Sequence, residues 1–235
     1  MAGVINDDWI AFWDSPHSVY VNARHKDVHY RLLAEQIAAL VSSGEARVLD
    51  YGCGEALHAD RVAAVAGEVL LCEAAAHLRA ALATRFADNP KIRVVAPHEV
   101  ARLPDRSLDL IVMHSVVQYL TPTGTGALFA LFRRLLEPGG LFVVGDIMQP
   151  KVAAAADALA LLRFGRANRF FLAAWWGLVR TLWSDHWRLR SRLGLTRYAE
   201  AVMIEKLEAA GFATHRAPAN LGHNQARMTF YAKPR

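Results

Sequence analysis

One stretch of nine residues constrains the fold of this chain more than any other, Arg47-Val-Leu-Asp-Tyr-Gly-Cys-Gly-Glu55. A short apolar run, Val48 and Leu49, ends in an acid and is followed by two glycines separated by one residue. This order is typical of the point where a parallel strand passes into a helix in a doubly wound α/β sheet. Glycine lets the backbone adopt positive φ and approach a ligand, and the start of the next helix offers unpaired N–H groups. The stretch therefore predicts a nucleotide-like ligand across Gly52 and Gly54.

Strands and helices alternate along the rest of the chain. Apolar runs predict strands at 68–73, 91–96, 108–113 and 141–146, with helices up to about residue 66 and over 75–86, 126–136 and 197–210. Two last runs, 213–216 and 228–233, predict a hairpin. Continuous apolar strands alternating with helices are typical of a sheet covered on both faces. We therefore predict an α/β fold with a seven-stranded, mostly parallel sheet, an antiparallel C-terminal hairpin and a helical insertion after the fifth strand.

The 235 residues are predicted to form one domain of four segments. These are an N-terminal lid and helix (1–45), a ligand-binding core (46–150), a basic and aromatic helical insertion (151–196), and the final helix and hairpin (197–235). Residues 151–197 hold nine basic and two acidic residues, a net of +7, whereas the remainder holds 18 basic and 20 acidic residues, a net of −2. Without an N-terminal signal pattern, a disulfide framework or zinc-site spacing, we expect a cytoplasmic protein with no bound metal.

The residues beside the glycine turn discriminate between cofactors. A dinucleotide fingerprint needs a third glycine three residues after the second, and this chain has Leu57 there. Asp50, two residues before Gly52, would repel a pyrophosphate and attract an ammonium group. S-adenosylmethionine has an ammonium group and a sulfonium, and it has no phosphate. The electrostatics therefore favour this methyl donor over a nicotinamide dinucleotide.

Four motifs in this order resemble those of the class I S-adenosylmethionine-dependent methyltransferases, over about residues 26–150 and 197–233. Val48–Gly54 is similar to the family's first motif, and Glu73 to the acid after the second strand that binds both ribose hydroxyls. Glu99–Asp109 is similar to the stretch whose acid accepts from the adenine amino group, and Leu136–Leu141 to the turn before the fifth strand. The resemblance implies a Rossmann-like fold and S-adenosylhomocysteine as a product. It implies that the cofactor is bound by Asp50, Gly52, Cys53, Gly54, Glu73, Ala74, Glu99, Val100, His114 and Ser115.

The methyl acceptor is expected above the ends of the fourth and fifth strands. Methyl transfer is an in-line displacement that needs alignment and a dry pocket, and a base only when the acceptor must lose a proton early. His114 and Asp146 are the catalytic candidates, because they end these strands and an imidazole titrates near neutral pH. A histidine that is merely packed at a strand end remains the alternative for His114. The residues predicted to contact the substrate are Tyr20, His25, His29, Tyr119, Asp146, Trp175 and His223.

The insertion 152–190 leaves several interpretations open. Its apolar run Phe170–Val179 is too short to span a bilayer, which takes about 20 residues. It suits a cap over an apolar acceptor, a contact in a homodimer, or a peripheral helix at the inner face of the membrane. Nucleic acid is not expected, because no recognisable binding module is present. We predict a methyltransferase for a small, hydrophobic or lipid-like acceptor. The alternative is a protein of this fold that binds the cofactor or a partner without catalysis.

Overall fold

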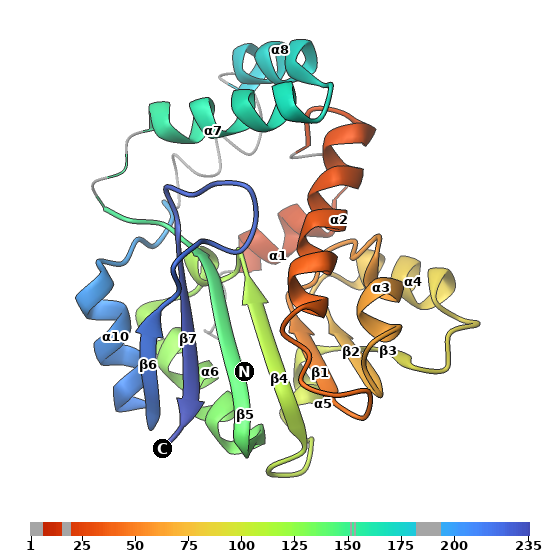
Figure 1. Cartoon of the computed structure of the whole chain (residues 1–235), viewed down its shortest axis with the longest axis vertical. Coiled ribbons are helices and arrows are strands. Elements are labelled where there is room, and N and C mark those ends of the chain that lie inside the picture. The colour runs from red at the N-terminus through yellow and green to blue at the C-terminus, as the bar shows by residue number, and fades with distance from the viewer. Residues whose placement is uncertain (1–6, 16–19, 151, 153, 182–193) are drawn as a thin grey trace.

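The computed structural model describes residues 7–15, 20–150, 152, 154–181 and 194–235 (Figure 1). The strands are β1 (Arg47–Tyr51), β2 (Glu68–Cys72), β3 (Ile92–Val95), β4 (Leu108–His114), β5 (Leu136–Ile147), β6 (Phe212–Arg216) and β7 (Met228–Pro234). The helices are α1 (Asp7–Trp13), α2 (Ala23–Ala38), α3 (Ala59–Ala63), α4 (Ala76–Arg85), α5 (Pro97–Val100), α6 (Pro122–Leu135), α7 (Ala154–Ala167), α8 (Phe171–Thr181) and α10 (Glu200–Ala209), with a 3₁₀ helix, η1 (Val117–Tyr119).

The seven strands form one sheet in the order β3-β2-β1-β4-β5-β7-β6. The first five pair in parallel, whereas β7 is antiparallel to both β5 and β6. This sheet confirms the predicted fold class, including the antiparallel C-terminal hairpin. The strand order reverses between β1 and β4, and ligands of such sheets bind above the carboxyl ends of the strands at that point.

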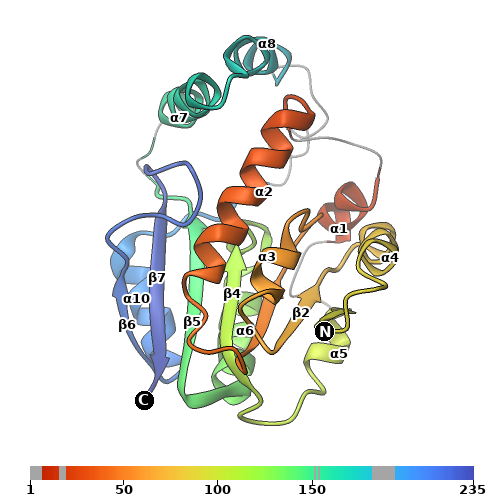
Figure 2. The same ribbon diagram turned by 45° about the vertical axis from the view of Figure 1, so that its right-hand side comes forward.

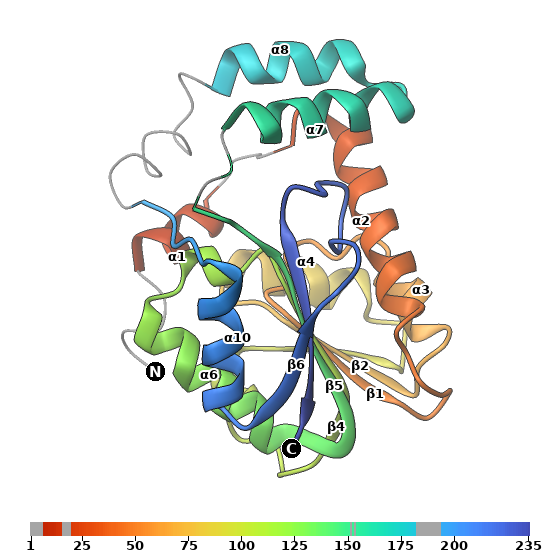
Figure 3. The same ribbon diagram turned by 60° about the vertical axis from the view of Figure 1, so that its left-hand side comes forward.

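Helices cover both faces of the sheet, which Figure 3 shows nearly edge-on with α6 and α10 on one side and α2 and α3 on the other. Helix α6 shows why the sequence folds this way. Thr121 accepts a hydrogen bond from the N–H of Gly124 and caps the helix, and a proline follows at the first helical position. Leu128, Phe129 and Phe132 recur at helical spacing and are fully buried against the sheet.

Two local expectations need correction. The helix after the glycine turn was expected to reach about Ala66, but α3 spans only Ala59–Ala63, because the turn continues through Ala56 at φ 39°. The turn expected before the fifth strand lies inside β5, as a bulge of residues 137–140 between its two paired parts. In addition, residues 7–13 form a helix, α1, which we did not predict.

A cap of two helices, α7 and α8, lies above the carboxyl edge of the sheet (Figures 1 and 2). Helix α2 runs from the sheet up to this cap, where Val28 packs with Phe170 and Ala174. Arg227 donates two hydrogen bonds to Asp157, at 3.1 and 2.7 Å, and so fastens α7 to the segment before β7. The insertion is therefore helical over 154–167 and 171–181, and its predicted part over 182–190 lies outside the described residues.

Candidate functional site

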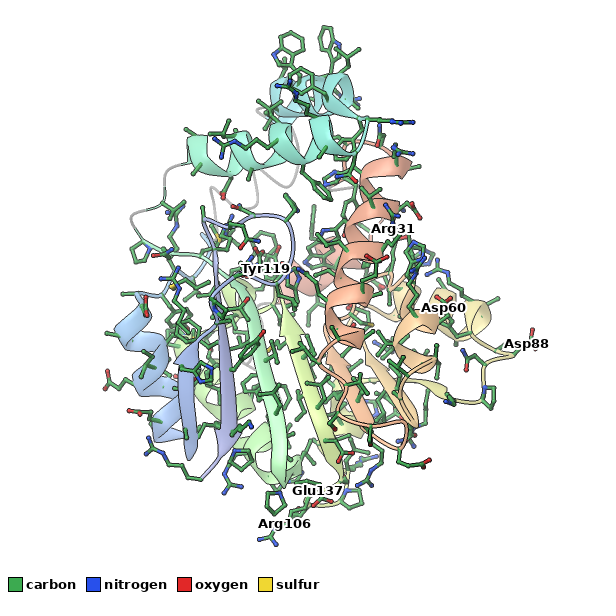
Figure 4. The ribbon with its side chains drawn as sticks, viewed as in Figure 1. Arg31, Asp60, Asp88, Arg106, Tyr119 and Glu137 are labelled. Atoms are coloured by element: carbon green, nitrogen blue, oxygen red, sulfur yellow. The ribbon has the colours of Figure 1, made fainter. Side chains whose placement is uncertain are left out.

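A cavity of about 300 Å³ opens above the carboxyl ends of β1, β2 and β4. Residues from distant parts of the sequence meet in its wall. Eleven of the predicted site residues line it: Tyr20, His29, Asp50, Gly52, Cys53, Gly54, Glu73, Ala74, His114, Ser115 and Tyr119. Figure 4 shows Tyr119 above the strand ends, whereas Arg106 and Glu137 lie at the opposite edge of the sheet. The cavity thus occupies the position expected from the strand order.

The glycine turn between β1 and α3 forms the floor of the cavity. Gly52 and Gly54 adopt φ of 77° and 59°, a region that favours glycine. The backbone N–H groups of Gly52 and Cys53 both donate to the Cys72 carbonyl, at 2.8 and 3.1 Å, and hold the turn against β2. A Cβ on Gly54 would lie 2.6 Å from the Tyr30 hydroxyl oxygen. Larger residues are therefore excluded here by conformation and by space.

Glu73, directly after β2, is buried beside this turn. Its two carboxylate oxygens accept from the N–H groups of Gly54 and Ala75, at 3.0 and 2.9 Å. Burial raises the pKa of Glu73, and the two N–H donors act in the opposite direction. Each carboxylate oxygen has a further lone pair, so Glu73 can also accept hydrogen bonds from hydroxyl groups of a ligand.

Asp50 lines the cavity without a hydrogen-bond partner among the residues that the structure describes. Burial, together with the negative charge of Glu73, raises the pKa of Asp50 to about 7. Two carboxylates at one end of a cavity, one of them unpaired, form a site that a cationic ligand would stabilise. The donor set therefore fits an ammonium group.

Helix α2 closes one side of the turn. Lys26 forms an ion pair with Glu55 at 2.9 Å, and the Tyr30 hydroxyl accepts from the Glu55 N–H at 2.9 Å. Lys26 and Tyr30 lie four residues apart and so share one face of the helix. This contact between the N-terminal helix and the glycine turn is absent from our expectations, since nothing in the local sequence pairs the two.

At the end of β4, His114 has a defined tautomer. Its Nε2 lies 3.0 Å from the carbonyl oxygen of Leu221. A carbonyl only accepts, so Nε2 is assigned the hydrogen and Nδ1 is left as an acceptor. Burial lowers the pKa of His114, although the charge of Asp146 acts in the opposite direction. This shift favours the neutral imidazole, whose Nδ1 is a hydrogen-bond acceptor.

Ser115 directly follows β4, and Asp146 lies beside it near the end of β5. Both adopt left-handed backbone conformations, with φ of 57° and 60°. The Ser115 hydroxyl donates to Asp146 Oδ2 at 2.6 Å, and the Asp146 N–H donates to Asn220 Oδ1 at 3.1 Å. Ser115 lines the cavity, but Asp146 is not among its lining residues. The structure thus places Asp146 behind Ser115, where it orients the hydroxyl.

Aromatic rings from α1 and η1 form the far wall of the cavity. Trp9 and Trp13 contact Tyr119, with ring centroids 4.7 and 5.8 Å apart. Ile10, Leu120 and Leu128 complete this apolar end. We did not predict Trp9 and Trp13 as site residues. Their spacing of four within an aromatic stretch is the signal that would have indicated them.

Three predicted substrate contacts are histidines between the cavity and the cap. His25 stacks on Phe170 at 5.0 Å and His223 on Phe164 at 4.4 Å, so both pack under the cap and neither is among the lining residues. His29 does line the cavity, and its Nδ1 is buried with no hydrogen-bond partner in the described part of the chain. Burial lowers the pKa of all three.

Three further predicted site residues lie outside the cavity. The Glu99 carboxylate accepts from the Ala96 N–H at 2.7 Å and caps α5, and Val100 is fully buried in the core. Trp175 lies on the outer face of α8 and is 47% exposed. Within the described ranges, no cluster of three or more histidine, cysteine, aspartate or glutamate side chains is arranged to hold a metal.

Comparisons with known proteins agree with this geometry. A family model described as a methyltransferase domain matches residues 48–140. An uncharacterized methyltransferase of Mycobacterium tuberculosis is 29% identical over 126 residues, which are 54% of this chain and 61% of that protein. The match thus spans less than two thirds of that relative.

Solved structures share the fold over nearly the whole chain. A complex of DhpI with SAH superposes with a TM-score of 0.61 at 12% identity, covering 97% of this chain and 96% of that one. DesVI of Streptomyces venezuelae gives 0.60 at 18% identity, covering 88% and 92%. The motifs, the domain match and the shared fold thus agree in making this chain similar to the class I S-adenosylmethionine-dependent methyltransferases, as its sequence indicated.

Proposed function

We propose that this protein transfers a methyl group from S-adenosylmethionine to a small, apolar acceptor. The observation that supports this best is the continuity of the cavity. One end holds the unpaired carboxylate of Asp50 beside Glu73, and the other is walled by Trp9, Trp13 and Tyr119. A charged, hydroxyl-bearing cofactor suits the first end, and an apolar molecule suits the second.

The residues at the charged end fit the cofactor group by group. The Asp50 carboxylate binds the ammonium, and Glu73 accepts hydrogen bonds from the ribose hydroxyls. Gly52 and Gly54 let the backbone approach closely. For the adenine, the prediction that Glu99 and Val100 bind it requires the Glu99 carboxylate to turn away from the Ala96 N–H that it caps.

When bound, S-adenosylmethionine would supply a methyl group on a positively charged sulfur, and the leaving group of the transfer would be the neutral thioether of S-adenosylhomocysteine. The chain aligns the acceptor for in-line attack and keeps water out of the apolar end. His114 Nδ1 takes the proton of a hydroxyl or amine acceptor, because its Nε2 hydrogen is already donated to Leu221. Asp146 has a positioning role through Ser115. We assign His29 to the substrate, because it lines the cavity next to His114.

Cofactor binding is tested first by calorimetry with S-adenosylmethionine and S-adenosylhomocysteine. Asp50→Ala and Glu73→Ala should each abolish measurable binding. Asp88→Ala is the matched control, because Asp88 is an exposed acid in the loop before β3, away from the cavity (Figure 4). Absence of binding by the wild-type protein would refute the proposed cofactor.

Turnover is tested separately, by incubating the protein and a deuterated-methyl cofactor with a lipid and metabolite extract. A labelled product of low polarity that is absent with Asp50→Ala supports the proposal, and its mass shift and fragmentation identify the methylated atom. Cofactor binding without any labelled product would favour the alternative of a non-catalytic binding protein.

A further inference from the structure

Helix α8 is apolar on two opposite faces. Its inner face packs on α7 and on the N-terminal end of α2 with the residue Val21 before it, so that Ala174 is fully buried and Gly177 lies against Val21. Its outer face exposes five large apolar side chains by 38 to 73%. These side chains are Phe171, Leu172, Trp175, Trp176 and Val179, and we call them the α8 stripe. Their spacing places them along one side of the helix. The inner contacts already anchor the cap, so packing within this chain does not explain the stripe.

The charged side chains of the cap that follow Asp157, up to Thr181, are all basic. Arg163, Arg166, Arg169 and Arg180 are exposed, and none forms an ion pair with a residue that the structure describes. Residues 158–181 contain no acidic side chain. A contiguous exposed apolar patch on a monomer marks an interaction site, and its basic rim indicates an anionic partner.

A second copy of the chain and an anionic lipid surface are the two partners to compare for their fit to an apolar stripe with basic side chains. A second copy of the chain, placed by a two-fold axis, would bring the same arginine rim against itself, with repulsion between like charges. An anionic lipid surface accepts both features, since tryptophan prefers the headgroup boundary and arginine binds lipid phosphates. With 11 residues, α8 is too short to cross a bilayer and long enough to lie in its surface. Among the described helices, none combines the length and hydropathy needed to cross a membrane.

We propose that the α8 stripe docks this protein on the surface of an anionic lipid bilayer, with the helix parallel to the membrane. The cap lies beyond the carboxyl edge of the sheet, at the far end of the molecule from the C-terminus (Figures 1 and 3). Docking through α8 therefore turns the cavity end of the domain toward the bilayer. This proposal concerns attachment and stands independently of methyl transfer.

Vesicle flotation with the full chain tests the proposal. Vesicles of phosphatidylcholine with phosphatidylglycerol are compared with vesicles of phosphatidylcholine alone. We expect binding to the anionic vesicles only, reduced about tenfold or more by the double substitution Trp175→Ser and Trp176→Ser. The matched control is Val65→Ser with Val202→Ser, since these valines are exposed to a similar degree on α3's C-terminal side and on α10. The control variant should bind like the wild type.

The basic side chains are tested by replacing Arg166 and Arg180 with glutamine, which should weaken binding to the anionic vesicles several-fold and reduce its salt dependence. Two further measurements separate membrane docking from misfolding and from self-association. Thermal unfolding checks that each variant is folded, because all substituted side chains are exposed. Equal binding of the wild type and the tryptophan variant would overturn the proposal. So would a lack of vesicle binding together with a dimer, seen by analytical ultracentrifugation, that the tryptophan substitutions dissociate.

Discussion

The pKa of Asp50, raised to about 7, makes cofactor binding a pH-dependent event. Only the ionised carboxylate attracts an ammonium group, so the protein must give up the Asp50 proton when it binds the cofactor below pH 7. With this pKa, affinity should rise about 25-fold between about pH 5.5 and 7.5, or about 2 kcal/mol. The asparagine of Asp50→Asn has no proton to lose, so this variant should bind weakly at both pH values with little difference between them.

Calorimetry at the two pH values, in buffers of different ionisation enthalpy, measures both the affinity and the number of protons released. The sign of the stability effect gives an independent check. Because the folded-state pKa of Asp50 is raised, its ionisation disfavours the unliganded fold as pH rises from about 4 to about 7. Asp50→Asn should therefore unfold no more easily than the wild type at about pH 7.5, although it loses the cofactor. A pH-independent affinity of the wild type would refute the reasoning, and so would an Asp50→Asn variant that binds normally.

Three further substitutions test the site, the core and the cap. Gly54→Ala should abolish cofactor binding in calorimetry and cost about 1–2 kcal/mol in urea unfolding, because of the left-handed φ and the Tyr30 hydroxyl; normal binding would contradict this. Phe142→Ala should lower the free energy of unfolding by about 3–5 kcal/mol, because this ring is fully buried, and a loss below about 1 kcal/mol would contradict it. Asp157→Asn should cost about 1–3 kcal/mol and speed proteolysis of the cap, since Arg227 loses its partner; an unchanged digestion rate would count against this.

The sheet was predictable because strands that are buried on both faces consist mainly of consecutive apolar residues. Buried strands such as β2 and β4 are largely apolar runs, and the predicted range 108–113 lies within β4. The end of the cavity at the glycine turn was predictable for a similar reason. A glycine turn after a strand constrains its own backbone, so Asp50, Gly52 and Gly54 could be placed from local chemistry alone.

The acceptor end was harder to predict, because its residues meet only through tertiary packing. Helix α1 is a single short segment without periodicity, and only its contact with Tyr119 reveals its role. Glu99 matches a family motif by spacing, yet its carboxylate caps its own helix. Trp175 is an aromatic residue of the kind that often lines a pocket, but its position on α8 places its side chain on the exposed face of the helix.

The two ends of the cavity differ in when they can form during synthesis. The cofactor end comes from β1, β2 and the glycine turn, which are close in sequence and adjacent in the sheet. The acceptor end needs Trp9 and Trp13 against Tyr119, and it adjoins a roof of His25 and His29 beside His223. Contacts of such large sequence separation form late. A growing chain can therefore complete the glycine-turn end of the cavity before the C-terminal hairpin has been synthesised. On the proposed assignment, a truncated product would bind the methyl donor without enclosing an acceptor.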